Sequence, residues 1–563
     1  MACWTIWTYW TYWTSLKNQR FCEVQYVQYV QYVQIVQFFL KLDGGFRYPS
    51  QLDKNPRIED NFLVTNKHEG EQMNITPEIR KAHERLGQTS VQFLEFISQN
   101  PQFLKAENYK VLQLDSIYQL QSWPTFVCRK TRDEMEAISL KVLNIMKSIP
   151  FKVFGGDLEQ ISQFYDIPKN LAKYILDGIT PEDISNLFSR GDFVMTNGDW
   201  KCVEYNVNSN LGGLQMQLPL WQSLFLKVPF LVDFLKNNNK KILNEDIYVE
   251  YFHHLIAAAR QHYPNESGPL NFVVALPENY QGEGGDPATQ EKFYNDEYKK
   301  ILKNYEGLSG EVIVAGYTGL NVSQGKVYCK GRRIHIILEW YQGFVPAFIR
   351  DVFKARNVLI YNGPISWLLS AKSNLALLSQ SEESQIFSPE ERTIIKKHIP
   401  WTRKVIAGKN TYRSEIIDMK TFIIKNREKL VLKPVLGFGG IDVFIGRYTS
   451  ETVWRGLVER ALNVEDWRNY PVGDTLSPQQ WQAVLMKAVA ANHWIVQEYA
   501  TCLSNLFPAG ENEPIEHSMI WGFFNFGSRP GGYLLRALPK DQGKGVINGL
   551  QGAKFSVVFD IDE

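Results

Sequence analysis

The chain has 563 residues, of which 44% are hydrophobic and 21% charged, and this length allows about two to four globular domains with full cores. Lysine and arginine together number 61 against 60 acidic residues, a balance that gives no electrostatic footprint for nucleic acid or a membrane surface. We therefore expect neither partner. The six cysteines include no C-x-x-C pair, which argues against a zinc or redox motif and favours a reducing, cytoplasmic location.

The first part of the chain has low complexity. Residues 4–14 (WTIWTYWTYWT) and 24–38 (VQYVQYVQYVQIVQF) repeat with a period of three, which matches neither a strand nor a helix. A polar residue at every third position also breaks any apolar run before the ~18 residues that a membrane helix needs. We expect residues 1–72 to be a tail outside the fold, with the functional chain beginning near Met73. There Thr76-Pro77-Glu78 is typical of a helix start.

Residues 73–185 have the apolar spacing of helices. The clearest examples are the run from Val91 to Ile97 and the run from Met135 to Met146, whose apolar residues fall on one helical face. We interpret this segment as mostly helical, with these faces in the core.

A β-hairpin is predicted next, at the start of a segment that covers residues 186–265, and a mostly apolar helix is expected after it at 218–235. Two β-rich runs, residues 192–196 and 200–207, flank an Asn-Gly-Asp turn at 197–199. With a three-residue loop, Asp192 lies directly opposite Glu204. Two opposed carboxylates repel each other unless a cation lies between them or one acid keeps its proton.

A divalent cation would relieve this repulsion. The same register places Arg190 opposite Asn206, so Asp192, Glu204 and Asn206 share one face. Their oxygen atoms suit magnesium or calcium better than zinc. The alternative, an ordinary hairpin with a solvated acidic edge, remains open.

The middle of the chain, residues 266–365, alternates between strand and helix patterns. Buried strands are expected at 271–276, 311–315 and 333–338, with a helix at 288–306. Such spacing is typical of an α/β unit with parallel strands, which could bind a substrate.

The last segment, residues 366–563, contains a glycine-rich loop between lysines and strands. A helix at 368–378 carries Lys372. A strand at 429–434 carries Lys433 and leads into glycines at 437–440, and the next strand is expected at 441–445. The backbone amides of a glycine loop can approach phosphates, and lysines at its base neutralise their charge. Further on, a strand at 494–499 and the motifs L-L-R-A and N-G-L-Q-G-A are expected near the same pocket.

In this order, the motifs resemble those of a known family. The order is R-x-D, E-x-N, a helix lysine, L-K-P-x-x-G-x-x-G, V-Q-E-Y, L-L-R-A and N-G with G-A, and it spans residues 185–563. It is similar to that of the circularly permuted ATP-grasp ligases, such as eukaryotic-type glutathione synthetase and the synthetase domain of glutathionylspermidine synthetase. The acids precede the lysines, which marks the permuted branch. The resemblance implies an α/β (α+β) ATP-grasp fold with an inserted α/β substrate domain and an N-terminal helical segment.

The resemblance also implies a role for each matching residue. The ligands of Mg²⁺ would be Asp192, Glu204 and Asn206. The residues that contact ATP would be Lys372, Lys433, Gly437, Gly439, Gly440, Gln497 and Glu498. The catalytic contacts would be made by Arg190 to the phosphoryl group and by Arg536 to the acid substrate. One departure is that residues 435–440 contain no acid, whereas glutathione synthetase has a glutamate metal ligand in this loop.

The activity implied by the resemblance is a carboxylate–amine ligase. It would activate a small acid or peptide as an acyl phosphate and transfer it to an amine, a chemistry that needs charge neutralisation and positioning more than a nucleophilic side chain. The partners would be small-molecule carboxylate and amine substrates. A homodimer is also compatible with the resemblance. An ATP-grasp phosphotransferase, a non-catalytic ATP-binding regulatory protein and a scaffold without ATP binding remain alternatives, because a fold does not fix a reaction.

Overall fold

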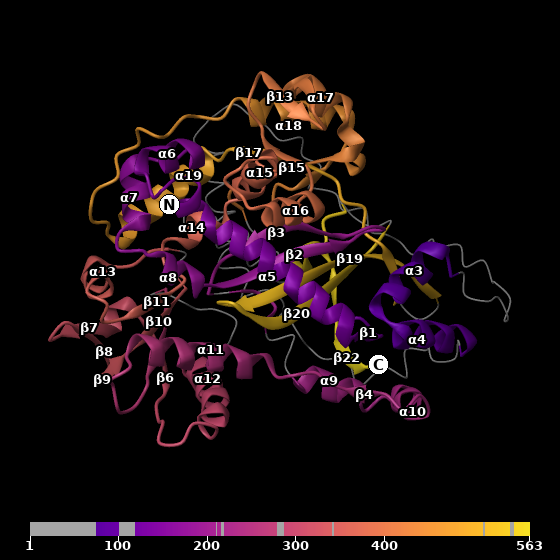
Figure 1. Ribbon diagram of the computed structural model, residues 1–563, viewed down its shortest axis with the longest axis horizontal. Coiled ribbons are helices and arrows are strands. Elements are labelled where there is room, and N and C mark those ends of the chain that lie inside the picture. The colour runs from indigo at the N-terminus through magenta and orange to yellow at the C-terminus, as the bar shows by residue number, and fades with distance from the viewer. Residues whose placement is uncertain are drawn as a thin grey trace, which may run out of the picture.

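The protein has a mixed α/β fold (Figure 1). The computed structural model describes residues 75–100, 119–209, 211–214, 219–277, 287–340, 343–437, 439–509, 513–540 and 545–563. The predicted tail, residues 1–72, lies outside the described residues. The predicted helix start is confirmed, because α3 (Pro77–Leu86) follows Thr76, whose side chain accepts a hydrogen bond from the Ile79 amide.

A six-stranded antiparallel sheet forms the centre of the molecule. Its strand order is β21-β20-β19-β2-β3, with β18 also paired to β19. The strands are β2 (Phe188–Met195), β3 (Trp200–Asn206), β18 (Ser504–Ala509), β19 (Glu513–Phe526), β20 (Arg529–Pro539) and β21 (Lys554–Ser556). The predicted hairpin is β2–β3, and its partner strands come from the C-terminal part of the chain.

The two faces of this sheet are covered by different helices. The long helix α5 (Arg129–Lys152) crosses one face (Figure 1), where the Ser139 hydroxyl lies 2.8 Å from that of Tyr205. Helix α11 (Ile247–His262) packs on the other face, where the rings of Tyr251 and Phe188 are 4.9 Å apart. Each large apolar side chain buried in this way contributes about 1.5–3 kcal/mol.

The predicted parallel α/β unit is confirmed. The sheet order is β11-β10-β5-β6, and all of its pairs are parallel. Its elements are β5 (Phe272–Leu276), α12 (Pro287–Leu302), β6 (Val312–Gly316), β10 (Ile336–Glu339) and β11 (Leu359–Tyr361). The strand predicted at 333–338 is divided, because β9 (Arg332–Ile334) pairs with β8 (Lys326–Cys329) and only β10 joins the parallel sheet.

A second antiparallel sheet carries the predicted glycine-rich loop. Its order is β12-β17-β15-β16, formed by β12 (Thr402–Lys404), β15 (Leu430–Pro434), β16 (Phe444–Ile445) and β17 (Trp494–Glu498). Its far side is covered by α17 (Met419–Lys425) and α18 (Glu451–Leu462). The strand predicted at 441–445 is shorter, because Gly439, Gly440 and Asp442 have positive φ angles that belong to a loop.

Two predicted helices are each divided in two. The helix predicted at 218–235 is α9 (Pro219–Phe225) and α10 (Pro229–Asn237), since Pro229 has no amide hydrogen and starts a new helix. The helix predicted at 368–378 is α14 (Ser366–Ser370) and α15 (Ser373–Gln380). Lys372 is therefore the N-cap of α15 and not a residue within a helix.

The remaining elements connect these layers. They are α4 (Gln88–Gln99), β1 (Thr125–Cys128), α6 (Leu158–Tyr165), α7 (Lys169–Leu176), α8 (Pro181–Ser185), β4 (Lys241–Ile242), η4 (Tyr317–Gly319), β7 (Leu320–Ser323), α13 (Ala347–Lys354), α16 (Pro389–His398), β13 (Lys409–Tyr412), β14 (Glu415–Asp418), η5 (Arg427–Lys429), η6 (Gly446–Tyr448), α19 (Pro478–Ala490), η7 (Gly549–Gln551) and β22 (Val558–Asp562). Among the described helices, none is both long and apolar enough to cross a membrane.

A buried acidic cluster joins α5 to β22 and makes stability depend on pH. Burial raises the pKa of Glu136 to about 7 and that of Asp560 to about 6, although Arg132 opposes both shifts. A raised pKa means that the folded state keeps a proton which the unfolded state releases above about pH 4.5. The contribution of Glu136 to stability is therefore present at acidic pH and is lost as the pH rises towards 7.

We expect Glu136→Gln to gain stability over the parent as the pH rises. Relative to the parent, its free energy of unfolding should increase by about 2 kcal/mol between pH ~5 and pH ~8, because the amide never carries the buried charge. Urea denaturation at both pH values measures this. Glu134→Gln, at an exposed position of the same helix, is the control and should show a constant difference. A pH-independent effect of Glu136→Gln would contradict the assignment.

Candidate functional site

The predicted site residues meet at one cavity of about 130 Å³ between the central sheet and the β12-β17-β15-β16 sheet. The loop at 545–548 and the glycine-rich loop close it. Ten of the twelve predicted site residues line it: Arg190, Asp192, Glu204, Asn206, Lys433, Gly439, Gly440, Gln497, Glu498 and Arg536. The other two reach the site through a chain of contacts, since Lys372 Nζ lies 2.9 Å from Glu204 Oε1 and donates to the Gly437 carbonyl.

The hairpin has the predicted pairs but reaches them by a different route. Asp192 is opposite Glu204 and Arg190 is opposite Asn206, as expected, yet Phe193 pairs with Cys202. Val203 is therefore an extra residue, a β-bulge in β3. The turn is one residue longer than the sequence indicated, because Met195 rather than Thr196 pairs with Trp200, and the bulge restores the register.

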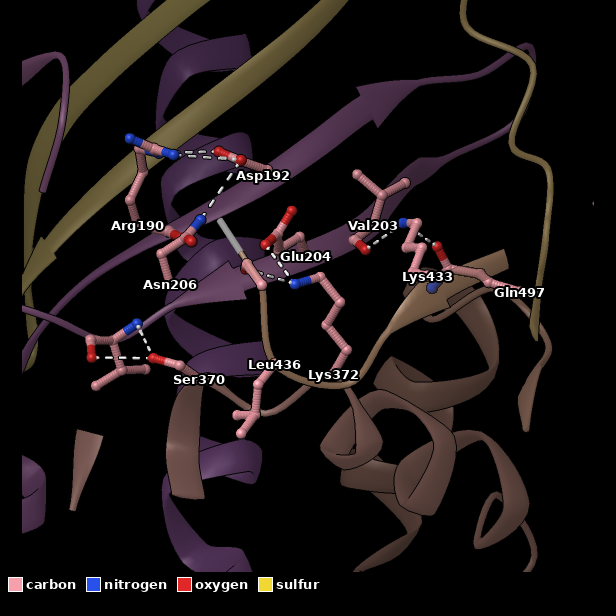
Figure 2. A network of polar contacts seen from close by, with 12 residues as sticks. Arg190, Asp192, Val203, Glu204, Asn206, Ser370, Lys372, Lys433, Leu436 and Gln497 are labelled. Atoms are coloured by element: carbon pink, nitrogen blue, oxygen red, sulfur yellow. Dashed lines mark hydrogen bonds and ion pairs between the residues drawn. The ribbon is translucent and has the colours of Figure 1, made fainter. Parts of the chain in front are cut away.

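The bulge also decides which way the side chains point. Cys202 and Tyr205 both join the core on the α5 side, although they are three residues apart and a regular strand would put them on opposite faces. Glu204 and Asn206 consequently face the cavity. The freed Val203 carbonyl accepts a hydrogen bond of 3.0 Å from Lys433 Nζ (Figure 2).

Asp192 is clamped between two guanidinium groups. Arg190 Nε is 2.9 Å from its Oδ1, and Arg536 Nη2 is 2.9 Å from its Oδ2. Burial opposes ionisation of Asp192, but the two arginines outweigh it and hold its pKa below the ordinary value. The predicted carboxylate repulsion is therefore relieved by arginine, and by Lys372 at Glu204, without need of a metal ion (Figure 2).

Lys433 is buried and held by two oxygen atoms. Besides the Val203 carbonyl, Gln497 Oε1 accepts a 2.8 Å hydrogen bond from its Nζ. Burial lowers the pKa of Lys433 to about 8, with Lys372 adding to the effect and Glu204 opposing it. Lys433 is therefore closer to losing its charge at neutral pH than an exposed lysine is.

The site carries an excess of positive charge. Four cations, namely Arg190, Arg536, Lys433 and the adjoining Lys372, face three carboxylates, Asp192, Glu204 and Glu498, and four minus three leaves +1. Within the described residues, Nε of the buried Arg536 has no hydrogen-bond partner. An enclosed surface of this sign attracts a polyanion such as a chain of phosphates.

Two glycines give the site its room, and only one was predicted. A Cβ at Gly522 of β19 would lie 2.8 Å from Arg190 Cδ and 3.1 Å from Asp192 Oδ1, so any side chain there would displace this ion pair. A Cβ at Gly440 would lie 2.6 Å from Val546 Cγ1, where the glycine-rich loop touches the 545–548 loop. No motif marks Gly522 in the sequence, because its importance depends on the pairing of β19 with β2.

Gln497 and Glu498 line the cavity, but their side chains already form hydrogen bonds with other residues. The Gln497 amide bonds Lys433 and, through Nε2, Thr402 Oγ1 at 3.1 Å. Glu498 is bonded by Arg413 at 2.8 Å and by the Tyr412 hydroxyl at 3.2 Å, both at the tip of the β13–β14 hairpin. The expected contacts of these two residues to adenine and ribose would require their present partners to move.

The donor chemistry fits a magnesium ion. Asp192, Glu204 and Asn206 bring carboxylate and amide oxygens to the same cavity, which are ligands that Mg²⁺ accepts. In the described part of the chain, no three His, Cys, Asp or Glu side chains are placed to hold a metal, so a site here depends on Asn206 as the third ligand. Binding through Asp192 would also loosen one of its arginine contacts.

A larger, open groove of about 1010 Å³ runs along α12. It lies at the amino ends of β5 and β6, whereas ligands of α/β sheets bind at the carboxyl ends. Several of its charges are already paired: Arg332 with Glu311, and Lys330 with Glu291. The smaller cavity, with its excess charge, is the stronger candidate.

Comparisons with known proteins give distant structural similarity. No protein-family model and no curated protein matches the sequence. The apo structure of a glutathione synthetase-like effector from Globodera pallida is 13% identical with a TM-score of 0.47, and the match covers 83% of this chain and 97% of that one. A protein assigned as a gamma-glutamylcysteine synthetase from Methylobacillus flagellatus is 9% identical with a TM-score of 0.36, covering 75% of this chain and 87% of that one.

Proposed function

We propose that the protein is a permuted ATP-grasp ligase, which uses Mg-ATP to join a small carboxylic acid or peptide to an amine. The observation that carries the proposal is the convergence of Arg190, Glu204, Lys433 and Arg536 on one cavity with an excess charge of +1. These residues come from two sheets and from distant parts of the sequence. A nucleotide triphosphate supplies the negative charge that the cavity lacks.

The cations have separate tasks in this account. Lys433 and Lys372 neutralise phosphate charge next to the glycine-rich loop, while Arg190 and Arg536 face the region where charge develops as the phosphoryl group moves to the acid. Glu204 and Asn206, with Asp192, would hold the magnesium ion, which neutralises phosphate charge when bound. The substrate carboxylate would attack the γ-phosphorus and expel ADP; the amine would then attack the acyl carbon and expel phosphate.

The proposed reaction needs no nucleophilic side chain from the protein. Cys202, the cysteine of β3, lies on the opposite face of the sheet, and burial raises its pKa well above the ordinary value. It therefore stays protonated. Closure of the two loops would keep water away from a reactive acyl phosphate.

Nucleotide binding requires the cavity to open. Its volume of about 130 Å³ is smaller than the ~300–1,000 Å³ typical of ligand pockets. The contact between Gly440 and Val546 is the place where the two covering loops meet, so these loops would separate when the nucleotide enters.

Phosphate release by the full chain tests the proposal. The protein would be incubated with Mg-ATP and pools of amino acids, short peptides and polyamines. Release that requires one acid and one amine, and is absent in Lys433→Met, is the expected result. Phosphate transfer to a single substrate would identify a phosphotransferase, and tight ATP binding without turnover in any pool would identify an ATP-binding regulatory protein; either would overturn the ligase.

A further inference from the structure

Three buried polar side chains form a chain of hydrogen bonds that leads to Lys433. Lys433 Nζ donates to Gln497 Oε1 at 2.8 Å, and Gln497 Nε2 donates to Thr402 Oγ1 at 3.1 Å. The Thr402 hydroxyl in turn donates to the Pro400 carbonyl at 2.8 Å. Thr402 is fully buried and Gln497 is 1% exposed, so water does not compete for these bonds.

The register of the sheet brings these residues together. Thr402 of β12 is directly opposite Gln497 of β17, and Gln497 is in turn opposite Val431 of β15, two residues before Lys433. Side chains two residues apart on a strand share a face, so Thr402, Gln497 and Lys433 lie in one row across the sheet.

The chain of bonds has only one direction. A carbonyl oxygen can only accept, so the Thr402 hydroxyl must give its hydrogen to Pro400. The Thr402 oxygen is then left as an acceptor, and only the NH₂ group of the Gln497 amide can donate to it. The amide oxygen of Gln497 must therefore point at Lys433, which favours the ammonium over the neutral amine, because only the amine could accept a hydrogen bond from a reversed amide.

We propose that Thr402 is a positioning residue for Lys433, acting through the Gln497 amide to keep an oxygen atom against the ammonium group. The inference rests on the proposed phosphate-binding role of Lys433. It gives Gln497 a task other than contact with the base.

The orientation matters because Lys433 is close to losing its charge. A reversed amide would direct an NH₂ group at the ammonium and disfavour the charged form. Loss of one oxygen atom would therefore move the deprotonation of Lys433 into the neutral pH range, where phosphate binding would weaken.

Thr402→Val and Thr402→Ser in the full chain test the proposal. Valine keeps the shape but removes the hydroxyl, whereas serine keeps the hydroxyl. The readout is the affinity for a Mg-bound, non-hydrolysable ATP analogue, measured by calorimetry from about pH 6.5 to about pH 9. We expect the valine variant to lose affinity about one pH unit earlier than the parent, and to bind roughly fivefold more weakly near pH 8 but much like the parent near pH 6.5. The serine variant should follow the parent throughout.

A double-mutant comparison guards against a purely structural effect. Gln497→Leu removes the amide itself, so adding Thr402→Val to it should change the pH profile no further. Additive effects, or a valine variant that weakens binding equally at every pH, would overturn the inference. If the parent itself does not bind the analogue, the proposed function is wrong. If the parent binds it and Thr402→Val has the same pH profile as the parent, only the role of Thr402 is wrong.

Discussion

Replacing Lys433 by methionine is expected to weaken binding of Mg-ATP by about 10- to 100-fold. The change removes one of the four cations of the cavity, and a hydrogen bond from a charged group, such as the one proposed from Lys433 to a phosphate, contributes about 1.5–3 kcal/mol. It also leaves the Val203 carbonyl and Gln497 Oε1 without their donor, so a stability loss of about 1–3 kcal/mol should accompany it. Calorimetry and urea denaturation measure the two effects.

The control for this prediction is Lys409→Met. Lys409 lies at an exposed position of β13 and does not line the cavity. It removes the same formal charge without touching the site, so its nucleotide affinity should equal that of the parent. Equal affinities for the parent and Lys433→Met would show that the phosphates bind elsewhere.

Replacing Asp192 by asparagine is expected to have the largest effect on stability. Both guanidinium groups that clamp Asp192 would stay buried beside a neutral amide, and breaking a buried pair from one side costs about 3–5 kcal/mol. The same change raises the excess charge of the site from +1 to +2. Metal-free ATP should therefore bind at least as tightly as it does to the parent, while the benefit from Mg²⁺ shrinks.

Asp199→Asn is the matched control for this substitution. Asp199 lies in the turn of the same hairpin and forms a half-exposed ion pair with Lys397 at 3.2 Å. Such pairs contribute about 0–1 kcal/mol, so this variant should unfold like the parent. If Asp192→Asn were as stable as Asp199→Asn, the clamp would not be a structural element. If it abolished binding of metal-free ATP, the charge argument would be wrong.

The hairpin shows how far the sequence alone could lead. The opposition of Asp192 and Glu204 followed from strand periodicity and a turn motif, and both are local properties. The structure has this pairing, yet the turn is one residue longer and the bulge at Val203 compensates. The bulge could not be predicted, because it is set by Tyr205 and Cys202, which both pack on the α5 side of the sheet.

The electrostatics of the site depended on contacts between distant segments. The repulsion of two carboxylates predicted a cation, but the sequence could not show that Arg536 of β20 and Lys372 would supply it. Gly522 and Thr402 carry no motif of their own. Their importance comes from what lies across the sheet from them, which only the strand pairings reveal.

The prediction of one long helix was wrong for a local reason that is visible in the sequence. Pro229 divides the helix predicted at 218–235, because proline lacks the amide hydrogen that would continue it. Two parallel strands of the middle unit, β5 and β6, were in contrast predicted correctly from their continuous apolar runs, since a strand buried on both faces needs no polar alternation.

A crystal structure of the full chain with a non-hydrolysable ATP analogue and Mg²⁺ tests the central claim most directly. The account predicts that the phosphates lie within hydrogen-bonding distance of Lys433 and Arg190, with the metal at Glu204 and Asn206. It also predicts that the loops at 437–440 and 545–548 are further apart than in the ligand-free protein. A nucleotide bound in the larger groove along α12, or a cavity that stays closed at saturating nucleotide, would contradict it.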